Sequence, residues 1–391
     1  MKHIFLLNPV AGKGQASTDV LPGIISAVKA KGVEYEIHRT VNVGDARRYV
    51  NNRCEDSGGA PVRFYAVGGD GTMNEVLNGL YGYGNAELAV VPAGTGNDLL
   101  RTFGVKEDFL DIERQIDGRA GKIDAIRYEF LDESEQAVAA SGDKPAAAAA
   151  SDENPVVAAP DNKPAAAAAS DENPVVAAPD NKFAVAAPGD NPAAVASCGN
   201  PAATAPGDKP AAAAGYALNM LNFGFDAEVV SRTTRIKNAP FMGGTVAYIG
   251  GVLSTLIGKR PLQLTIEADG LPVAEGAYLF AGACNGRYSG GGFEGMPRAV
   301  IGDGILDVLI IGDMTRRRFL SLLGKYRAGT YMDDPRMDGY AWHYPVKEAV
   351  FRPQGEMYTA IDGEPIRTGA VRVSIEPAAI NFSVPAGLRN P

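Results

Sequence analysis

The chain has 391 residues, and 46% of them are hydrophobic, which is enough for two domains with buried cores. Its formal net charge is −9, and no nucleic-acid motif is present, so we expect no nucleic-acid binding. The three cysteines are scattered without metal-ligand spacing and indicate a reducing compartment. The apolar start of the chain ends at Asn8-Pro9, too early for a secretion signal. These features favour a cytoplasmic protein.

Strands and helices alternate through the N-terminal part, which we take as a domain over residues 1–122. Strands are predicted at 2–7, 33–40, 62–67 and 87–94, and helices at 20–28, 45–53, 72–80 and 97–104. This alternation predicts a parallel sheet covered by helices. Ligands of such sheets bind beyond the carboxyl ends of the strands, where glycine-bearing turns occur at 8–14, 68–72 and 92–98.

The sequence VGGDGTMNEVLNGL at 67–80 carries the most informative of these turns. Gly68, Gly69, Asp70 and Gly71 lie between a buried strand and an amphipathic helix, where free backbone N–H groups favour a phosphate. A plain glycine turn is the alternative. Thr72 and Glu75 have the spacing of a capping box, which predicts Thr72 as the N-cap of the helix.

Residues 132–215 form a segment of unusual composition. PAAAAASDENPVVAAPDNK occurs twice in succession, at 145–163 and 164–182, and the segment holds 12 acidic and 4 basic residues. Because aromatic residues are nearly absent, little apolar surface is available to offset chain entropy. We interpret the segment as a low-complexity insertion that replaces a hairpin loop and acts as a spacer. Almost all of the net charge resides in it.

The remaining C-terminal part is rich in strands. Strands are predicted at 122–130, 216–225, 305–312, 348–354, 357–365, 371–377 and 380–384, and helices at 239–258 and 315–329. The stretch 262–284 is predicted as two strands joined by an Asp-Gly turn at 269–270. We therefore expect an antiparallel β-sandwich over 123–375, interrupted by the insertion, and a segment 376–391 that returns to the first domain. The stretch 239–258 has no charged residue, but its five glycines favour a buried helix over a transmembrane span.

Two common nucleotide fingerprints are absent from the first glycine turn. AGKGQAS lacks the leading glycine and the hydroxyl residue of a P-loop, and its third glycine position for a dinucleotide fold is Ser17. A hydride-transferring Rossmann enzyme is therefore disfavoured.

The motifs that remain resemble one family when they are taken in order. GGDGTMNEVLNGL, VPAGTGNDLLRTFG, CNGRYSGGGFEGMPRAVIGDGILDVLII and IDGEP are similar to the diacylglycerol kinase catalytic-domain family of soluble bacterial lipid kinases and their sphingosine-kinase relatives. The resemblance covers nearly the whole chain outside 132–215. It implies an N-terminal α/β nucleotide domain, a C-terminal β-sandwich, and a cleft that holds ATP and a lipid head group.

The resemblance also implies which residues contact ATP. These are Asn8, Pro9, Gly12, Thr40, Gly68, Gly69, Asp70, Gly71, Thr72, Asn74, Glu75, Thr95 and Asp98. Asp70 is expected near Mg²⁺, because a carboxylate among phosphates is repulsive without a cation. A structural role for Thr40, or a helix cap at Thr95 or Asn97, is the alternative reading.

A structural Mg²⁺ site is implied at IGDGILD. The matching positions are the Asp303 carboxylate and the carbonyls of Val300 and Ile305, while Gly302 stands where many relatives have a polar or acidic residue. An ordinary Asp-Gly turn before a strand is the alternative.

The general base implied by the resemblance is Asp362 in AIDGEP, with Glu364 as its companion carboxylate. Phosphoryl transfer needs a base for the hydroxyl proton, an in-line arrangement and cations on the phosphates. A plain hairpin turn is again the alternative. The predicted reaction moves the γ-phosphoryl group of ATP to diacylglycerol and gives phosphatidic acid. Phosphatidylglycerol, a sphingoid base and NAD are other acceptors, and a nucleotide-binding regulator without turnover is a non-enzymatic alternative.

The expected partner is a lipid at the inner membrane surface, reached by peripheral contact. Basic residues at 316–318 suit anionic head groups, although such a run is also typical of a solvated helix face. The oligomeric state is left open, with a homodimer among the assemblies considered.

Overall fold

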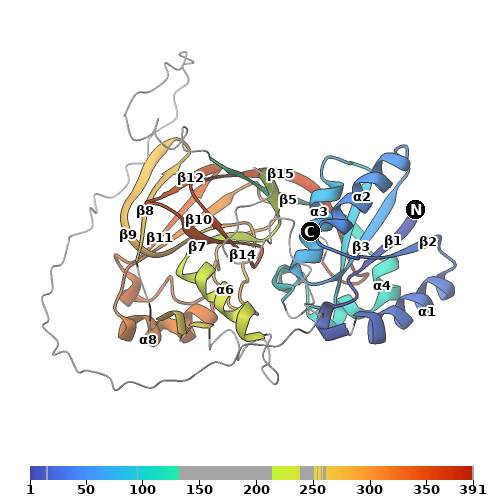
Figure 1. The fold of residues 1–391 in the computed structure, drawn as a ribbon, viewed down its shortest axis with the longest axis horizontal. Helices are drawn as coiled ribbons and strands as arrows, with labels where there is room; N and C mark the ends of the chain where they lie inside the picture. Colours follow the sequence, from blue (N-terminus) through green and yellow to red (C-terminus); the bar gives the residue numbers. More distant parts are fainter. Residues whose placement is uncertain are drawn as a thin grey trace, which may run out of the picture. The chain divides into compact units, whose positions relative to one another are not determined.

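The computed structural model describes residues 1–14, 16–94, 96–131, 214–237, 251–252, 254–256, 258 and 261–389 (Figure 1). The N-terminal part alternates strands and helices as predicted. Its strands are β1 (Lys2–Leu7), β2 (Tyr35–Arg39), β3 (Val62–Gly68) and β4 (Ala86–Pro92). Its α-helices are α1 (Leu21–Lys31), α2 (Asp45–Asp56), α3 (Asp70–Leu80) and α4 (Ile112–Ile116), with 3₁₀ helices at Asp98–Thr102 (η3) and Lys106–Leu110 (η4).

The four N-terminal strands form a parallel sheet in the order β4-β3-β1-β2. Alternate residues of each strand face opposite layers. Ile4 and Phe64 pack with α2 and α3, whereas Phe5 and Tyr65 pack with α1 and α4. All seven residues of β3 are buried, because helices cover both faces of this strand (Figure 1). The carboxyl ends of the strands are thus left free for a site.

The C-terminal part consists mainly of antiparallel strands. They are β5 (Arg119–Phe130), β6 (Ala214–Ala217), β7 (Met220–Gly224), β8 (Leu262–Ala268), β9 (Leu271–Cys284), β10 (Leu306–Gly312), β11 (Ala341–Val346), β12 (Glu348–Pro353), β13 (Met357–Ile361), β14 (Glu364–Thr368) and β15 (Val371–Val384). The helices are α6 (Phe225–Lys237), α8 (Arg316–Arg327) and the 3₁₀ helix η5 (Pro335–Met337).

These strands fold over a common core. In the sheet, β7 and β12 are separated by β9 and β8, yet the rings of Phe223 and Phe351 stack with centroids 4.2 Å apart. Inward-facing residues of both layers belong to one buried cluster, including Leu221, Ile266 and Val373. The predicted β-sandwich is therefore confirmed.

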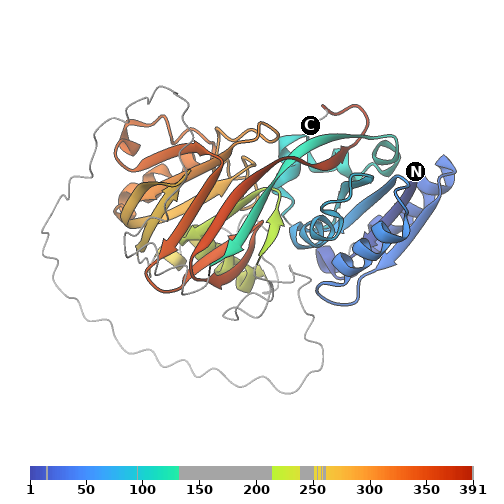
Figure 2. The same ribbon diagram turned by 90° about the horizontal axis from the view of Figure 1, so that it is seen from above.

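Strands β5 and β15 join the parallel and antiparallel regions into one sheet (Figure 2). They pair antiparallel from Val371↔Phe130 to Val384↔Arg119, with a shift between Glu376 and Ile380. The first half of β15 pairs with β12, and Asn381 and Phe382 pair in parallel with β4. The end of the chain thus adds a strand to the N-terminal sheet, although the exact domain limits remain a prediction.

Two local expectations are corrected by the structure. Helix α3 begins at Asp70, with Gly69 as its N-cap and no side-chain cap, so Thr72 lies in the first turn. Thr72 Oγ1 instead accepts a hydrogen bond from Asn8 Nδ2 at 3.2 Å. The single strand expected at 216–225 is divided into β6 and β7, because the chain bends at residues 218 and 219. This bend, which we call the β6–β7 elbow (residues 218–220), becomes important below.

The helix predicted at 315–329 is present as α8. Most of the helix predicted at 239–258 lies outside the described residues, although 251–252 and 254–256 are helical. Among the described residues, no helix is both long enough and apolar enough to cross a bilayer.

The low-complexity segment falls almost entirely outside the described residues, since β6 begins at Ala214. Strands β5 and β6 are antiparallel neighbours with Glu129 opposite Ala214, so the segment connects two adjacent strand ends. We expect that replacing residues 132–213 by a short Asn-Gly turn leaves the melting temperature unchanged, because such a turn closes a two-stranded hairpin. The kcat should stay within about twofold of the wild type. A large loss of kcat at an unchanged melting temperature would assign the segment a role beyond that of a spacer.

Candidate active site

Two glycine turns interlock at the carboxyl ends of β3 and β4. The Gly68 carbonyl accepts hydrogen bonds from Ala93 N at 3.0 Å and from Asn97 Nδ2 at 3.3 Å. A Cβ atom on Gly96 would lie 2.0 Å from Asp70 Oδ2, so only glycine fits there. Gly69 and Gly71 open helix α3 at this point. The backbone therefore comes close to whatever ligand occupies the start of α3.

Asp70 lies half-buried between these turns and carries an unfavourable charge. The Asn97 N–H donates to both carboxylate oxygens, at 3.0 Å and 2.9 Å. Burial raises the pKa of Asp70 to about 7, and the nearby charges of Asp98, Asp362 and Glu364 contribute to the increase against the Asn97 hydrogen bond. The negative charges of Asp98, Asp362 and Glu364 thus act on Asp70 from both halves of the chain, which favours a cation or a proton at Asp70.

Asp98 links the N-terminal part of the chain to a glycine-rich loop of the C-terminal part. Its Oδ2 accepts a hydrogen bond from Gly291 N at 2.8 Å, and its Oδ1 accepts one from Arg101 Nε at 3.3 Å. Gly290, Gly291 and Gly292 all have positive φ, which an L-residue rarely adopts. Arg101 was not singled out from the sequence, yet it places a half-exposed guanidinium beside the carboxylate cluster.

Asp362 lies in the hairpin turn between β13 and β14, with φ values of 46° at Asp362 and 86° at Gly363. This is the Asp-Gly turn that the sequence allows. The side chain is nevertheless turned inward and is only 5% exposed. The turn and an active-site role are therefore compatible.

The Asp362 carboxylate is held by four donors. Its Oδ1 accepts from Asn219 N at 2.9 Å and Met220 N at 3.1 Å, and its Oδ2 accepts from Leu218 N at 2.9 Å and Asn74 Nδ2 at 3.3 Å. Burial raises the pKa of Asp362 above its ordinary value, although all four hydrogen bonds act in the opposite direction. The result is a fixed carboxylate of increased basicity.

The residues of the first glycine turn lie at the ends of β1 and β2. Asn8 follows β1 and is 5% exposed; its Oδ1 accepts a hydrogen bond from Val10 N at 3.1 Å. Thr40 is 6% exposed and donates its N–H to the Leu7 carbonyl at 3.0 Å. Pro9 and Gly12 lie in the same turn, with φ of 61° at Gly12. These positions share the sheet edge with Gly68 and Asp70, whereas Thr95 lies outside the described residues.

Glu75 has a structural task in this arrangement. It is 3% exposed, and its two oxygens accept hydrogen bonds from Gly44 N at 2.9 Å and Ala46 N at 3.1 Å. The N-cap of α2 is Gly44, which has no side chain to satisfy these first-turn amides. Glu75 therefore stabilises the start of α2, and its predicted contact with ATP remains a prediction.

We expect Glu75→Ala to lower the free energy of unfolding by about 1–3 kcal/mol, because two buried amides lose their acceptor. Thermal melting measures this change, and KM for ATP should stay within about twofold of the wild type. A KM for ATP raised tenfold at an unchanged melting temperature would instead make Glu75 a nucleotide contact.

The loop proposed to hold a structural metal ion lies elsewhere. Asp303 Oδ1 accepts a hydrogen bond from Ile305 N at 2.9 Å, and the Val300 carbonyl accepts one from Asp303 N at 3.4 Å. Lys347 Nζ donates to the Gly304 carbonyl, so the chain itself supplies a positive charge here. These groups fit a metal ion only in part, because the Asp303 carboxylate and the Val300 carbonyl already accept hydrogen bonds within the loop. Magnesium at this loop remains a prediction.

Magnesium at the carboxylate cluster has a different basis. Within the described ranges, no three His, Cys, Asp or Glu side chains are grouped closely enough to hold a metal ion by themselves. Mg²⁺ commonly takes one or two carboxylates and completes its coordination with substrate phosphates and water. The oxygen donors and excess negative charge around Asp70 fit that mode of binding.

Several contacts that build the site could not be predicted from the sequence. Asn97 holds Asp70, Gly291 holds Asp98, and the β6–β7 elbow holds Asp362. Every residue except proline has a backbone N–H group, so the residue types of the elbow do not indicate that its N–H groups bind a carboxylate. Asn97 did have a sequence signal, since an asparagine next to glycines favours the left-handed conformation that it adopts here, with φ of 68°.

Comparisons with known proteins identify the family and the fold of the chain. The model of the diacylglycerol kinase catalytic domain matches residues 2–128, and that of the YegS C-terminal NAD kinase beta sandwich-like domain matches 219–384. A Shewanella frigidimarina protein named "Probable lipid kinase YegS-like" is 22% identical, covering 98% of this chain and 94% of that relative. A diacylglycerol kinase of Staphylococcus epidermidis is 34% identical over 121 residues, 30% of this chain and 37% of that relative. A diacylglycerol kinase structure from Bacillus anthracis shares the fold, with a TM-score of 0.54, 15% identity and coverage of 98% and 97% of the two chains.

Proposed function

Because this chain belongs to the diacylglycerol kinase catalytic-domain family of lipid kinases, we propose that it transfers the γ-phosphoryl group of ATP to the hydroxyl of diacylglycerol, forming phosphatidic acid. The observation that carries this proposal is a pair of hydrogen bonds that cross the site, from Gly291 N to Asp98 Oδ2 at 2.8 Å and from Asn74 Nδ2 to Asp362 Oδ2 at 3.3 Å. They place Asp70 and Asp98 on one side and Asp362 and Glu364 on the other. The first pair follows the glycine turns of the parallel sheet, and the second pair flanks a hairpin of the sandwich. A nucleotide and an acceptor hydroxyl would meet between them.

The residues divide the reaction between the two sides of the site. The start of α3 and the turn at 68–71 offer backbone N–H groups and the positive end of a helix dipole to the phosphates. Asp362 takes the proton of the acceptor hydroxyl while the oxygen of that hydroxyl forms a bond to the γ-phosphorus of ATP. The bond between the γ-phosphorus and the β–γ bridging oxygen breaks at the same time, which releases ADP. Mg²⁺, when bound, offsets the charge of the phosphates and of Asp70.

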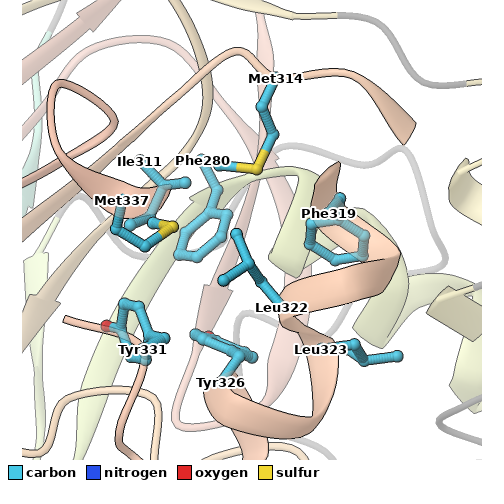
Figure 3. A pocket seen from close by; sticks show the side chains of 9 residues that line it. All are labelled: Phe280, Ile311, Met314, Phe319, Leu322, Leu323, Tyr326, Tyr331 and Met337. Atoms are coloured by element: carbon cyan, nitrogen blue, oxygen red, sulfur yellow. The ribbon is translucent and has the colours of Figure 1, made fainter. Parts of the chain in front are cut away.

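A small apolar cavity of about 20 Å³ lies beneath α8 (Figure 3). It has room for little more than one water molecule, so the support for a lipid acceptor comes from the outer surface of α8. Phe280 and Ile311 from the sheet, Phe319 and Tyr326 from α8, and Met337 from η5 are among its lining residues, and the described lining contains no charged side chain. Outside the pocket, α8 exposes Leu320 and begins with three arginines. A basic surface with an exposed leucine suits contact with an anionic membrane. We propose peripheral contact with the membrane through this face.

The experiment that tests the function is phosphate transfer from labelled ATP with Mg²⁺ to lipids in mixed micelles. The panel contains diacylglycerol, phosphatidylglycerol, ceramide and a sphingoid base, with NAD as a soluble control. Label in phosphatidic acid supports the proposal, and label in another lipid keeps the mechanism while changing the acceptor. Binding of ATP without transfer to any acceptor would favour a nucleotide-binding regulator.

A further inference from the structure

The β6–β7 elbow that holds Asp362 is itself held from two sides. Its carbonyls accept hydrogen bonds from one neighbouring segment, where Asn285 Nδ2 donates to Leu218 O at 2.8 Å and Asn285 N donates to Asn219 O at 2.9 Å. Its N–H groups point the other way and donate to the Asp362 carboxylate. The elbow therefore has one orientation, and the position of Asp362 depends on it.

One face of helix α3 holds the strand that enters this elbow. Asn74, Asn78 and Tyr81 are spaced at i, i+4 and i+7 and so share a face. Asn74 Nδ2 and Asn78 Nδ2 each donate to Tyr216 O at 3.0 Å, and Tyr216 N donates to Asn78 Oδ1 at 3.0 Å. The rings of Tyr81 and Tyr216 stack with centroids 3.5 Å apart. Residue 216 is thus fixed two residues before the elbow.

Asn74 is the member of this face that reaches Asp362 itself. Its side chain is fully buried, and the two hydrogens of Nδ2 are directed to Tyr216 O and Asp362 Oδ2. Its Oδ1 accepts a hydrogen bond from Asn78 Nδ2 at 2.9 Å. No donor of the Asn74 amide is left for a nucleotide phosphate, although its helix starts at the phosphate turn.

We propose that Asn74 is a positioning residue for Asp362 and that α3 thereby couples the phosphate turn to the acceptor side of the site. This inference rests on the proposed kinase function, in which Asp362 takes the hydroxyl proton. The same helix presents its first turn to the phosphates and its Asn74–Tyr81 face to the elbow. A rigid helix with both contacts fixes the distance between nucleotide and base, as in-line transfer requires. Asn74 acts on the chemical step and leaves ATP affinity to other residues.

The test measures kcat and KM for ATP separately in Asn74→Ala and in the wild type. The acceptor is the lipid that the wild type phosphorylates best in the panel above. We expect kcat to fall about 10–100-fold, because misplacement of a catalytic group by about 1 Å has effects of this size. KM for ATP should stay within twofold. Asn51→Ala is the matched control: Asn51 donates to Tyr83 OH at 3.2 Å on the outer side of the domain, and this variant should keep both constants.

The opposite effect on the two constants, in which KM for ATP changes and kcat does not, would overturn the inference. A raised KM for ATP with kcat unchanged would make Asn74 a nucleotide contact, and unchanged constants would leave it without a role in turnover. Should Asn74→Ala fail to fold, Asn78→Ala decides by the same criteria, because it removes the hydrogen bond that Asn74 Oδ1 accepts and the contacts of Asn78 with Tyr216 while Asn74 stays in place. Absence of lipid phosphorylation by the wild type is a separate result, which counts against the proposed function before any variant is compared.

Discussion

Asp362→Asn is expected to lower kcat by about 10²–10⁴-fold, the range that general-base catalysis commonly contributes. Binding of ATP should persist, because the nucleotide turns belong to the other half of the site. Burial raises the pKa of Asp362, so we also expect wild-type kcat to fall as the pH is lowered. The midpoint of this fall should lie above about pH 4, the ordinary pKa of aspartate. Initial rates between pH 4 and 9 measure both effects.

The same variant should also lose stability, contrary to what the sequence suggests for so conservative a change. Both oxygens of Asp362 accept backbone N–H groups of the elbow. An asparagine has one acceptor oxygen, so its NH₂ group faces an N–H donor in either orientation. We expect a loss of about 1–3 kcal/mol in the free energy of unfolding. Rates must therefore be compared at equal folded fraction, and near-normal kcat there would remove Asp362 as the base.

The fold could be predicted from the sequence because hydrophobic periodicity reports burial. Strand β1 was predicted with its observed limits, and the Asp-Gly turns at 269–270 and 362–363 form two-residue hairpins as expected. The division of 216–225 into two strands was missed. YALNMLNFGF contains no glycine or proline at the bend, and what stabilises the bend is a carboxylate more than 140 residues away in the chain.

The residues of the candidate site could be predicted from sequence motifs, but the groups that each side chain contacts could not. The sequence identifies Asp70 and Glu75 as equivalent members of GGDGTMNE, yet Asp70 faces other carboxylates while Glu75 satisfies the amides of α2. Side chains one helical turn apart differ in role because different segments pack against them. Tertiary packing of this kind has no counterpart in a local sequence pattern.

Asp70→Asn is expected to stabilise the protein without ligands while removing its activity. The pKa of Asp70 is raised by burial to about 7, against 3.8 in an unfolded chain. The folded state therefore binds a proton that the unfolded state has released, and stability falls as pH rises from about 4 through 7. Ionised Asp70 therefore lowers the free energy of unfolding at pH 8, by an amount on the order of a few kcal/mol. An uncharged asparagine avoids that cost, and its oxygen still accepts a hydrogen bond from Asn97 N.

Thermal melting with and without the substitution at pH 4.5 and pH 8 tests this expectation. Asp70→Asn should melt several degrees higher at pH 8 and close to the wild type at pH 4.5, where Asp70 is already protonated. Turnover should fall by about 10² or more, because the carboxylate that favours a cation beside the phosphates is gone. Asp338→Asn, an exposed site outside the cluster, should change neither property. Equal melting temperatures for Asp70→Asn and the wild type at pH 8 would show that the charge of Asp70 is already compensated within the chain, and the case for a cation at this cluster would fail with it.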